Sequence, residues 1–306
     1  MASEVSRTQG VWATVKPVDV ILAVLVAVIW GFAFVATRIG LDSFSAPQLT
    51  ALRFLIAAVL AVFLPRPRIS WLGFVSIGLT LYTGQFLFQF FGIASGMPPG
   101  LTSVIIQTQA FFTVAFAGVV LHEVPTRREL TGMVAAFAGV AVIAVSLGRD
   151  ASLAAFGLTL IAAVSWGVGN VLVKQTGTVE TLPLMVWLTL VPPLPALALS
   201  MILDGPAALF GALMTASWRS LGAALYLGLV ATVLAYVIWG SLLRTYSAVT
   251  VGTFALLVPF VGAGASAVVF GEQFGLFRLA GMALVLLGLG IIAPWGRASE
   301  PLPVRS

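Results

Sequence analysis

Cysteine is absent from the 306 residues of the chain, and histidine occurs once, at His122. The missing cysteines exclude disulfides, thiol catalysis and cysteine-bound metals, and a single histidine excludes a histidine-rich metal site. Charged residues are also scarce, at 8% of the chain against roughly 25% in typical soluble domains. These charges are too few to cover a globule of this size in water, so the composition indicates a protein dissolved in lipid.

Long apolar stretches take the place of the missing charges, since 60% of the residues are hydrophobic. A membrane-spanning helix needs about 20 mostly apolar residues. In lipid, only helices and closed β-barrels satisfy all backbone hydrogen bonds. The sequence shows no strict alternation of apolar and polar residues that would predict a barrel, so the apolar stretches are predicted to be helices. We therefore predict an all-α integral membrane protein with ten transmembrane helices at roughly 18–38, 47–64, 69–94, 99–120, 128–147, 153–173, 182–203, 219–243, 248–270 and 275–294. The longest connector is 204–218.

Positive charge is distributed unevenly between the two sides of this arrangement. Ten Lys and Arg residues fall at the ends and tails on one side and four on the other. The positive-inside rule then places both termini, with tails 1–17 and 295–306, in the cytoplasm. The net charge of +5 forms no dense patch, so we expect a lipid bilayer and no nucleic acid as partner.

Two sets of positions recur in the two halves of the chain. Trp30-Gly31, which leads to Arg38, recurs 136 residues later as Trp166-Gly167, which leads to Lys174. A second set recurs after 149 residues and pairs Glu123 with Glu272, Leu130 with Leu279, Gly132-Met133 with Gly281-Met282, and Gly139 with Gly288. Five helices per half is an odd number, so the repeats 18–147 and 153–294 must be inverted relative to each other. Inverted repeats are typical of secondary transporters, which bind substrate near the bilayer midplane.

The same motifs resemble those of the EamA group of the drug/metabolite transporter superfamily. The resemblance is carried by Trp30-Gly31 with Arg38, Leu52-Arg53-Phe54, Leu121-His122-Glu123, Trp166-Gly167 with Lys174, Pro259, and Phe270-Gly271-Glu272. Within that group the chain is most similar to the YddG-type exporters of aromatic amino acids in bacterial inner membranes. The resemblance implies alternating access, with rocking of the third-fourth and eighth-ninth helix pairs.

Polar and aromatic side chains inside the predicted spans are the candidates for a substrate site. Carboxamides at membrane depth need partners, so they either join helices or line a cavity, and the aromatics either pack or stack on a substrate. The neutral carboxamides suit a neutral or zwitterionic solute. The candidate substrate-binding residues are Trp30, Tyr82, Gln85, Gln89, Gln107, Trp166, Asn170, Tyr236 and Trp239.

Charged residues near the membrane allow two readings each. Arg53 lies about six residues inside its helix, where it either reaches the outer interface and helix-end carbonyls or contacts a substrate carboxylate. The residues at equivalent helix ends either form gate-closing ion pairs or anchor short loops; they are Arg38, Glu123, Lys174 and Glu272. Acidic residues fall only at ends, in loops or in tails, which favours facilitated diffusion or exchange over proton coupling.

These features predict a transporter that exports small neutral or zwitterionic metabolites, with aromatic amino acids as the leading substrate. We expect it to act as a monomer without a cofactor or metal. Other cargoes within the family are another metabolite, a drug or a nucleotide sugar. A membrane receptor or scaffold is the alternative from another class, but the loops and tails are too short to hold a docking domain. The sequence shows no group of residues typical of a catalytic nucleophile or a metal site, so we do not expect an enzyme.

Overall fold

The computed structural model describes residues 15–147, 152–177 and 179–293. Over this part of the chain, nine helical segments are long and apolar enough to cross a membrane, and Leu276–Ile292 is a shorter apolar helix. The predicted all-α membrane fold with ten helices is confirmed. Most of the predicted N-terminal tail 1–17, namely residues 1–14, and the whole predicted C-terminal tail 295–306 lie outside the described residues.

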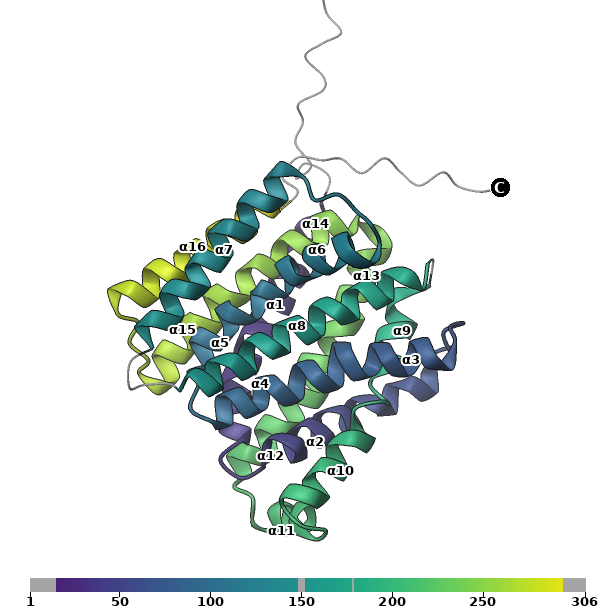
Figure 1. Ribbon diagram of the computed structural model, residues 1–306. Coiled ribbons are helices and arrows are strands. Elements are labelled where there is room, and N and C mark those ends of the chain that lie inside the picture. Colours follow the sequence, from purple (N-terminus) through teal and green to yellow (C-terminus); the bar gives the residue numbers. More distant parts are fainter. Residues whose placement is uncertain (1–14, 148–151, 178, 294–306) are drawn as a thin grey trace, which may run out of the picture.

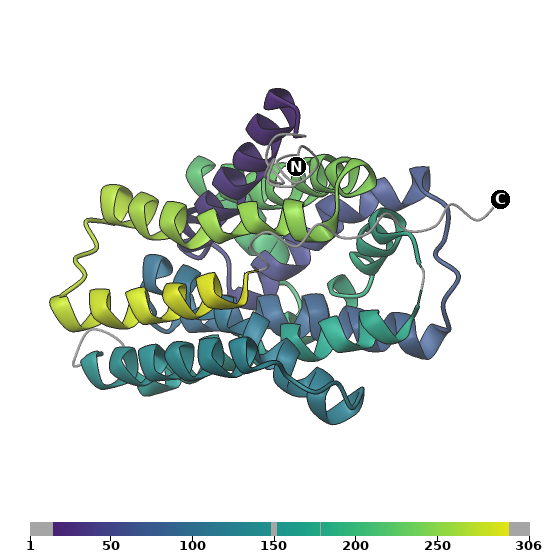
Figure 2. The ribbon, with the colours of Figure 1, turned by 90° about the horizontal axis from the view of Figure 1, so that it is seen from above.

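Each half contains five spans, several of which consist of more than one helical segment. The first half contains α1 (Pro17–Gly40), α2 (Ala46–Ala58), α3 (Trp71–Ile77), α4 (Gln85–Ala94), α5 (Pro99–Ile105), α6 (Gln109–Val120) and α7 (Arg127–Ser146). The second half contains α8 (Leu153–Gln175), α9 (Thr181–Leu188), α10 (Pro193–Leu203), α11 (Ala208–Thr215), α12 (Trp218–Leu225), α13 (Ala235–Thr245), α14 (Ala248–Phe254), α15 (Val258–Phe270) and α16 (Leu276–Ile292). Figure 1 shows most of the long helices lying side by side, and Figure 2 shows the same bundle from above.

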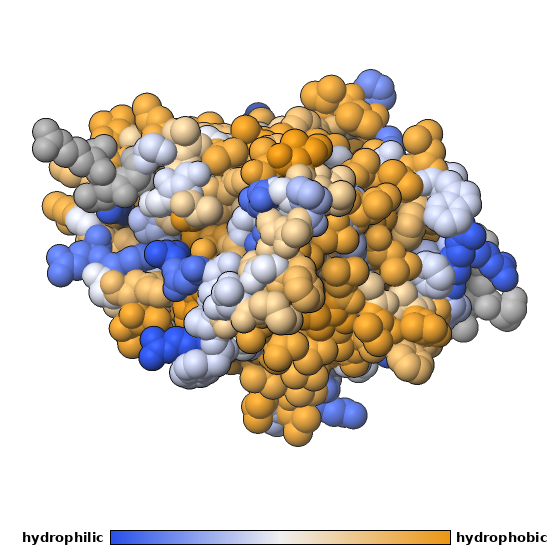
Figure 3. Space-filling view, turned by 90° about the horizontal axis from the view of Figure 1, so that it is seen from below, coloured by the Kyte–Doolittle hydropathy of each residue, from blue (hydrophilic) through white to orange (hydrophobic). Residues whose placement is uncertain are grey.

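The outer surface of the bundle is apolar. Figure 3 shows a mostly hydrophobic face on which the hydrophilic residues lie mainly toward the two sides of the view. Large apolar side chains such as Val62, Val145, Leu194 and Ile202 are exposed on the surface of the bundle. A surface this apolar is unfavourable in water and favourable against lipid tails. The chain is therefore a multi-pass membrane protein.

Several spans change helical geometry partway along, and they do so at repeat-related positions. The fourth span has a 3₁₀ turn at Ile106–Thr108, and the ninth has one 149 residues later at Ala255–Leu257. The third and eighth spans contain π-helical stretches at Gly78–Gly84 and Tyr226–Leu234. Irregular turns within long helices often mark functional bends. Both pairs of spans therefore carry such 3₁₀ or π-helical stretches, which we call bends, in the helices for which the resemblance predicts movement.

The bends are held by side chains from the other half. In the third span, the carbonyl of Thr80 accepts a hydrogen bond from Ser165 Oγ in α8 at 2.7 Å. In the eighth span, the carbonyl of Ala231 accepts one from Trp30 Nε1 in α1 at 3.0 Å. A side chain that bonds a backbone carbonyl relieves the loss of the regular helical ladder. Each repeat thus stabilises the irregular helix of the other.

Helices α7 and α16 pack against each other through four glycines in a reciprocal pattern. A Cβ on Gly139 would lie 2.5 Å from the Gly281 carbonyl oxygen, and one on Gly281 would lie 2.8 Å from the Gly139 oxygen. Gly132 and Gly288 show the same relation, at 2.8 and 2.5 Å. Such mutual contact is what a two-fold relation between the two repeats requires. Only glycine permits the backbones to approach this closely.

Two ends of the bundle matter for the site. We call the end that carries Pro17 and Ile292 the terminal end, and the opposite end the far end.

The structure also contains one helix that the sequence did not predict: α11 lies within the connector 204–218, with Phe210 and Met214 exposed. A criterion based on span length missed this helix because its 8 residues are too few to cross a bilayer.

Candidate functional site

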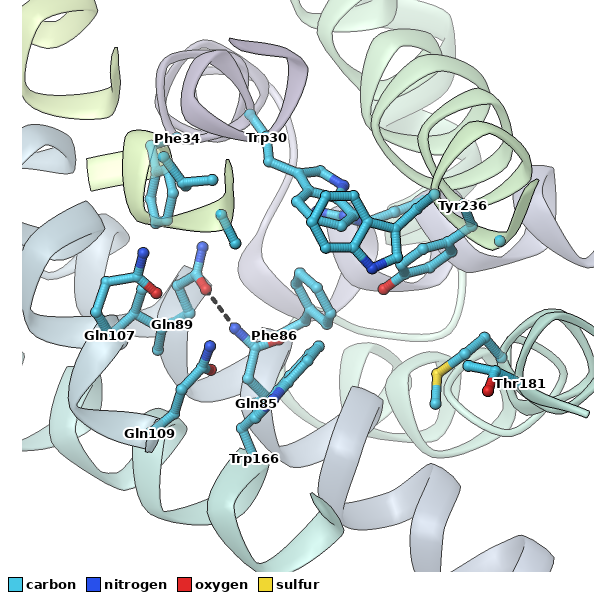
Figure 4. Close-up of a pocket in the computed structure, with 18 of the residues that line it drawn as sticks. Trp30, Phe34, Gln85, Phe86, Gln89, Gln107, Gln109, Trp166, Thr181 and Tyr236 are labelled. Atoms are coloured by element: carbon cyan, nitrogen blue, oxygen red, sulfur yellow. Dashed lines mark hydrogen bonds between the residues drawn. The ribbon is translucent and has the colours of Figure 1, made fainter. Parts of the chain in front are cut away.

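A cavity of about 310 Å³ lies at mid-depth between the two halves. Its wall draws on the middle of α1, α2 and α8, on the starts of α4, α6 and α15, on α13 and on the two 3₁₀ turns, and Figure 4 shows the main side chains. Thr181, Leu182 and Leu243 also line it, and they lie in the first turn of α9 and the last turn of α13. The cavity therefore extends from the centre of the bundle toward the terminal end. Its size falls at the lower end of the range for small-molecule sites, about 300 to 1,000 Å³.

One wall of the cavity is built from carboxamides of the first half. Gln85, Gln89, Gln107 and Gln109 gather on one side in Figure 4. Gln85 Nε2 donates to Gln89 Oε1 at 2.6 Å, because residues four apart share a helix face. Gln85 Oε1 is the single buried side-chain N or O atom without a hydrogen-bond partner among the described residues. A buried acceptor of this kind favours a ligand that donates to it.

The opposite wall is aromatic. The Trp30 ring lies 4.9 Å from that of Trp239 and 6.0 Å from that of Tyr236, the latter edge-on. Trp166, the repeat partner of Trp30, lines the cavity from α8 and meets Phe86 edge-on at 6.5 Å. Tilted and edge-on rings at these distances attract one another and present flat apolar area to a ligand. The cavity thus combines a carboxamide wall with aromatic rings, of which Phe86 and Trp166 lie near Gln85 in Figure 4.

Arg53 is the cation in the cavity wall, and it is 4% exposed. Its Nε donates to Thr232 Oγ1 at 3.0 Å, and its guanidinium carbon lies 4.1 Å from the centre of the Phe86 ring. The expectation that this side chain reaches the outer interface is wrong. The stem folds inward because Thr232 and Phe86 supply a hydrogen bond and a cation–π contact inside the bundle.

Seven of the nine predicted substrate-binding residues line the cavity, and Tyr82 and Asn170 do not. Tyr82 is fully buried behind the wall, where its hydroxyl donates to the Met185 carbonyl at 3.2 Å. Asn170 Nδ2 donates to Thr113 Oγ1 at 3.1 Å and joins α8 to α6. We assign both to helix packing, the alternative left open for them above.

The four charged residues at helix ends take different partners. Lys174 Nζ lies 2.6 Å from the Glu123 carboxylate at the terminal end, with both side chains about half exposed. At the far end, Arg38 pairs with Asp42, four residues further along the chain, at 2.5 Å. Glu272 instead accepts from the backbone N–H of Gly100 at 3.1 Å and from Ser266 Oγ. Whether these contacts gate the cavity stays a prediction.

The Glu272 carboxylate lies in a partly buried place against the first turn of α5. Burial raises the pKa of this carboxyl above its usual value, while the bonds from Ser266 and Gly100 and the nearby charge of Arg278 lower it in part. A carboxylate beside a helix N-terminus also satisfies N–H groups that have no partner within the helix. Glu272 therefore links the ninth span to the fourth at the far end.

Further cavity residues were missed because they carry no polar group or lie on unexpected faces. Gln109 belongs to the carboxamide wall, and the 3₁₀ turn before it brings Gln107 and Gln109 to the same cavity. The position of Gln109 in a run of polar residues was the available signal. The apolar lining includes Phe34, Phe86, Met185 and Val258, which the sequence does not distinguish from other core residues.

An inverted two-fold bundle with a mid-depth cavity between its halves defines a secondary transporter. A sequence model described as the EamA-like transporter family matches the chain twice, over residues 18–145 and 153–293. The chain belongs to this family. The predicted family, and a transporter rather than an enzyme, are thereby confirmed.

Several curated proteins are similar over nearly the whole chain. A probable amino-acid metabolite efflux pump of Salmonella typhimurium is 40% identical over 89% of this chain and 94% of its own. A protein of the same description from Escherichia coli is 37% identical over the same shares. A probable terminal-alkyne amino-acid exporter of Streptantibioticus cattleyicolor is 30% identical over 93% of each chain.

Among solved structures, one crystal structure superposes with a TM-score of 0.61. The match covers 90% of this chain and 96% of the other at 17% identity. An identity this low shows the fold alone.

Proposed function

We propose that this protein exports amino acids and related metabolites, aromatic ones foremost, from the cytoplasm across a bacterial inner membrane. The descriptions of three relatives as amino-acid metabolite efflux pumps and an amino-acid exporter support the cargo class. The observation that carries the proposal is the cavity itself, whose lining combines Arg53 and carboxamides with the rings of Trp30, Tyr236 and Trp239. Such a wall offers hydrogen bonds to the polar end of an amino acid and apolar area to its ring.

The direction of loading follows from the shape of the cavity. The cavity extends toward the terminal end, and the distribution of Lys and Arg assigns that end to the cytoplasm. A substrate would therefore enter from the cytoplasm in the conformation described here. Release would require the far end to open and the terminal end to close.

Bending within the third-fourth and eighth-ninth helix pairs provides this movement in the proposal. The 3₁₀ turns in the fourth and ninth spans and the π-helical stretches in the third and eighth lie partway along these helices. Bends of this kind let one half of a helix move against the other. The two repeats would exchange their conformations during a transport cycle.

The driving force in this proposal is the substrate gradient. The residues that line the cavity include no aspartate or glutamate in the part of the chain that the structure describes. A proton-coupled carrier commonly keeps a titratable group at membrane depth. Facilitated diffusion or exchange therefore fits the cavity better than proton coupling.

Counterflow in proteoliposomes tests the proposal. Vesicles loaded with unlabelled phenylalanine should accumulate external labelled phenylalanine, and dissipating a pH gradient should leave that uptake unchanged. Trp239→Ala should weaken apparent affinity roughly tenfold or less through lost ring contact. Trp71→Ala, at an exposed tryptophan outside the cavity, is the matched control and should not change it. Absence of counterflow with every amino acid tried would refute the proposed function.

A further inference from the structure

The charge of Arg53 has no acidic counterpart in the cavity. Its one recorded hydrogen bond among the described residues goes from Nε to the neutral hydroxyl of Thr232. Aspartate and glutamate are missing from the cavity lining in the described part of the chain. A buried cation without an anion is costly, and such a charge is retained where something else neutralises it. A carboxylate is the ligand group that matches a guanidinium best, because it accepts two parallel hydrogen bonds.

The carboxamide wall offers hydrogen-bond acceptors to a ligand ammonium but no negative charge. Its Gln85, Gln89, Gln107 and Gln109 side chains are neutral, and the Phe86 ring already faces the Arg53 guanidinium. Because its ammonium charge offsets its carboxylate, a zwitterion bound at Arg53 leaves the buried site with a net positive charge at low dielectric. A ligand whose nitrogen is acylated, or replaced by hydroxyl, carries no such charge. Its N–H or O–H instead donates to an acceptor such as the unpartnered Gln85 Oε1.

We propose that the cavity selects its substrate by the carboxylate and does not require the ammonium, so that N-acylated and 2-hydroxy aromatic acids are transported alongside the parent amino acids. Arg53 is the specificity-determining residue for the carboxylate, and Gln85 accepts from the substituent beside it. This inference rests on the proposed function, since it assumes that the cavity takes amino-acid-derived metabolites. It adds the charge class of the substrate.

A panel of phenylalanine and four analogues tests the inference on the unchanged protein. Binding is followed by intrinsic tryptophan fluorescence of purified protein, and transport by competition with labelled phenylalanine in proteoliposomes. N-acetylphenylalanine and 3-phenyllactate should bind at least as tightly as phenylalanine. Phenylalaninamide and phenethylamine, which lack the carboxylate, should bind about tenfold more weakly or worse, the loss expected for one charge-assisted bond.

The outcomes separate this inference from the proposed function. If phenethylamine binds as well as phenylalanine, or if acetylation abolishes binding, the inference is refuted while the exporter proposal stands. If no member of the panel binds or competes, the proposed function fails first. Tight binding of the two acids with weak binding of the amide and the amine supports the inference.

Variants at the arginine provide a second, independent reading. Arg53→Gln should abolish the preference for acids over phenylalaninamide and leave amide binding unchanged, so amide binding reports that the cavity is intact. Thr232→Val removes the hydrogen bond that orients Arg53 Nε. It should reduce the preference for acids over phenylalaninamide, but by less than Arg53→Gln does. Arg66→Gln, at an arginine outside the cavity that lies over Trp71, is the control and should keep it. If Arg53→Gln does not fold, the panel and Thr232→Val still decide. Equal binding of acids and amide by the unchanged protein, or an undiminished preference in Thr232→Val, refutes the inference.

Discussion

Glu123 and Glu272 hold the same position in the two repeats, yet their surroundings differ. Glu123 pairs with Lys174 in an exposed ion pair at the terminal end. The repeat counterpart of Lys174 is Arg38, which pairs with Asp42 instead. That leaves Glu272 to bind the N–H of Gly100 and the hydroxyl of Ser266 at the far end, where it is partly buried.

We interpret this difference as a difference in state between the two ends of the bundle. At the far end, Met97 and Leu101 are buried beneath the contact between Glu272 and α5. At the terminal end, the cavity reaches the first turn of α9. We infer that the buried arrangement of Glu272 belongs to a closed end and the exposed pair of Glu123 to an open one. The following three predictions test that comparison.

The largest expected effect comes from removing the Glu272 carboxylate. Glu272→Ala leaves the Gly100 N–H without its partner, which costs about 1 to 3 kcal/mol and should favour opening of the far end by about tenfold. Because the chain has no native cysteine, Met97→Cys can serve as a single reporter there. The rate of its labelling by a membrane-impermeant maleimide should rise accordingly.

Glu123→Ala is the matched control for this experiment. It removes an exposed ion pair, and pairs of this type contribute roughly 0 to 1 kcal/mol. Labelling at Met97→Cys should therefore stay near its original rate. Equal effects of the two alanine substitutions would show that the repeat-related glutamates do not differ in role.

A smaller effect should follow from pH. The raised pKa of Glu272 means that the closed end holds a proton more tightly than an open, solvated one. Acidification should then favour closure, and closure should weaken as pH rises through that raised pKa. Reporter labelling should slow severalfold from neutral pH toward about pH 5, where protonation of ordinary carboxyls begins.

Glu272→Gln corrects this measurement for the pH dependence of the thiol. Its amide oxygen still accepts from Gly100, but the side chain does not titrate. The ratio of labelling rates between the unchanged glutamate and this variant should therefore depend on pH, with the variant remaining closed. A constant ratio would remove Glu272 from the pH response.

The smallest expected effect concerns the residues that precede the two glutamates. His122 has φ 55° and Gly271 has φ 68°, so both repeats use the left-handed region where the helix ends. A side chain costs about 1 kcal/mol in that conformation, which glycine adopts freely. His122→Gly should raise the free energy of unfolding by about this amount, and Gly271→Ala should lower it similarly. Thermal unfolding in detergent measures both; a destabilised His122→Gly would indicate a further contact of the imidazole.

The membrane class and the inverted repeat were predictable because both are written into local sequence. Span length follows from apolar runs, and the spacing of Trp30 and Trp166 aligns the halves. The bends were not predictable. The stretches Gly78–Gly84 and Tyr226–Leu234 contain no proline, and their geometry depends on hydrogen bonds from Ser165 and Trp30 across the repeat boundary.

The candidate site was predictable in kind and only partly in membership. Gln85 and Gln89 share a helix face by their spacing alone, and both line the cavity. Tyr82 and Asn170 are also hydrogen-bonding side chains within the spans, but each has its partner elsewhere, at the Met185 carbonyl and at Thr113. The inward direction of Arg53 depends on Thr232, 179 residues away. Residue type indicates which side chains need partners, whereas only the packed bundle determines where those partners lie.

The four glycines between α7 and α16 also bear on how such a protein diversifies after gene duplication. Each of Gly132, Gly139, Gly281 and Gly288 touches the backbone of the opposite copy. A larger residue at any of them would collide with a carbonyl group, which no side-chain change in the other copy relieves. The two copies are thus free to diverge around the cavity, where all four glutamines come from the first copy and aromatic rings come from both, while the glycine contact between α7 and α16 constrains both copies alike.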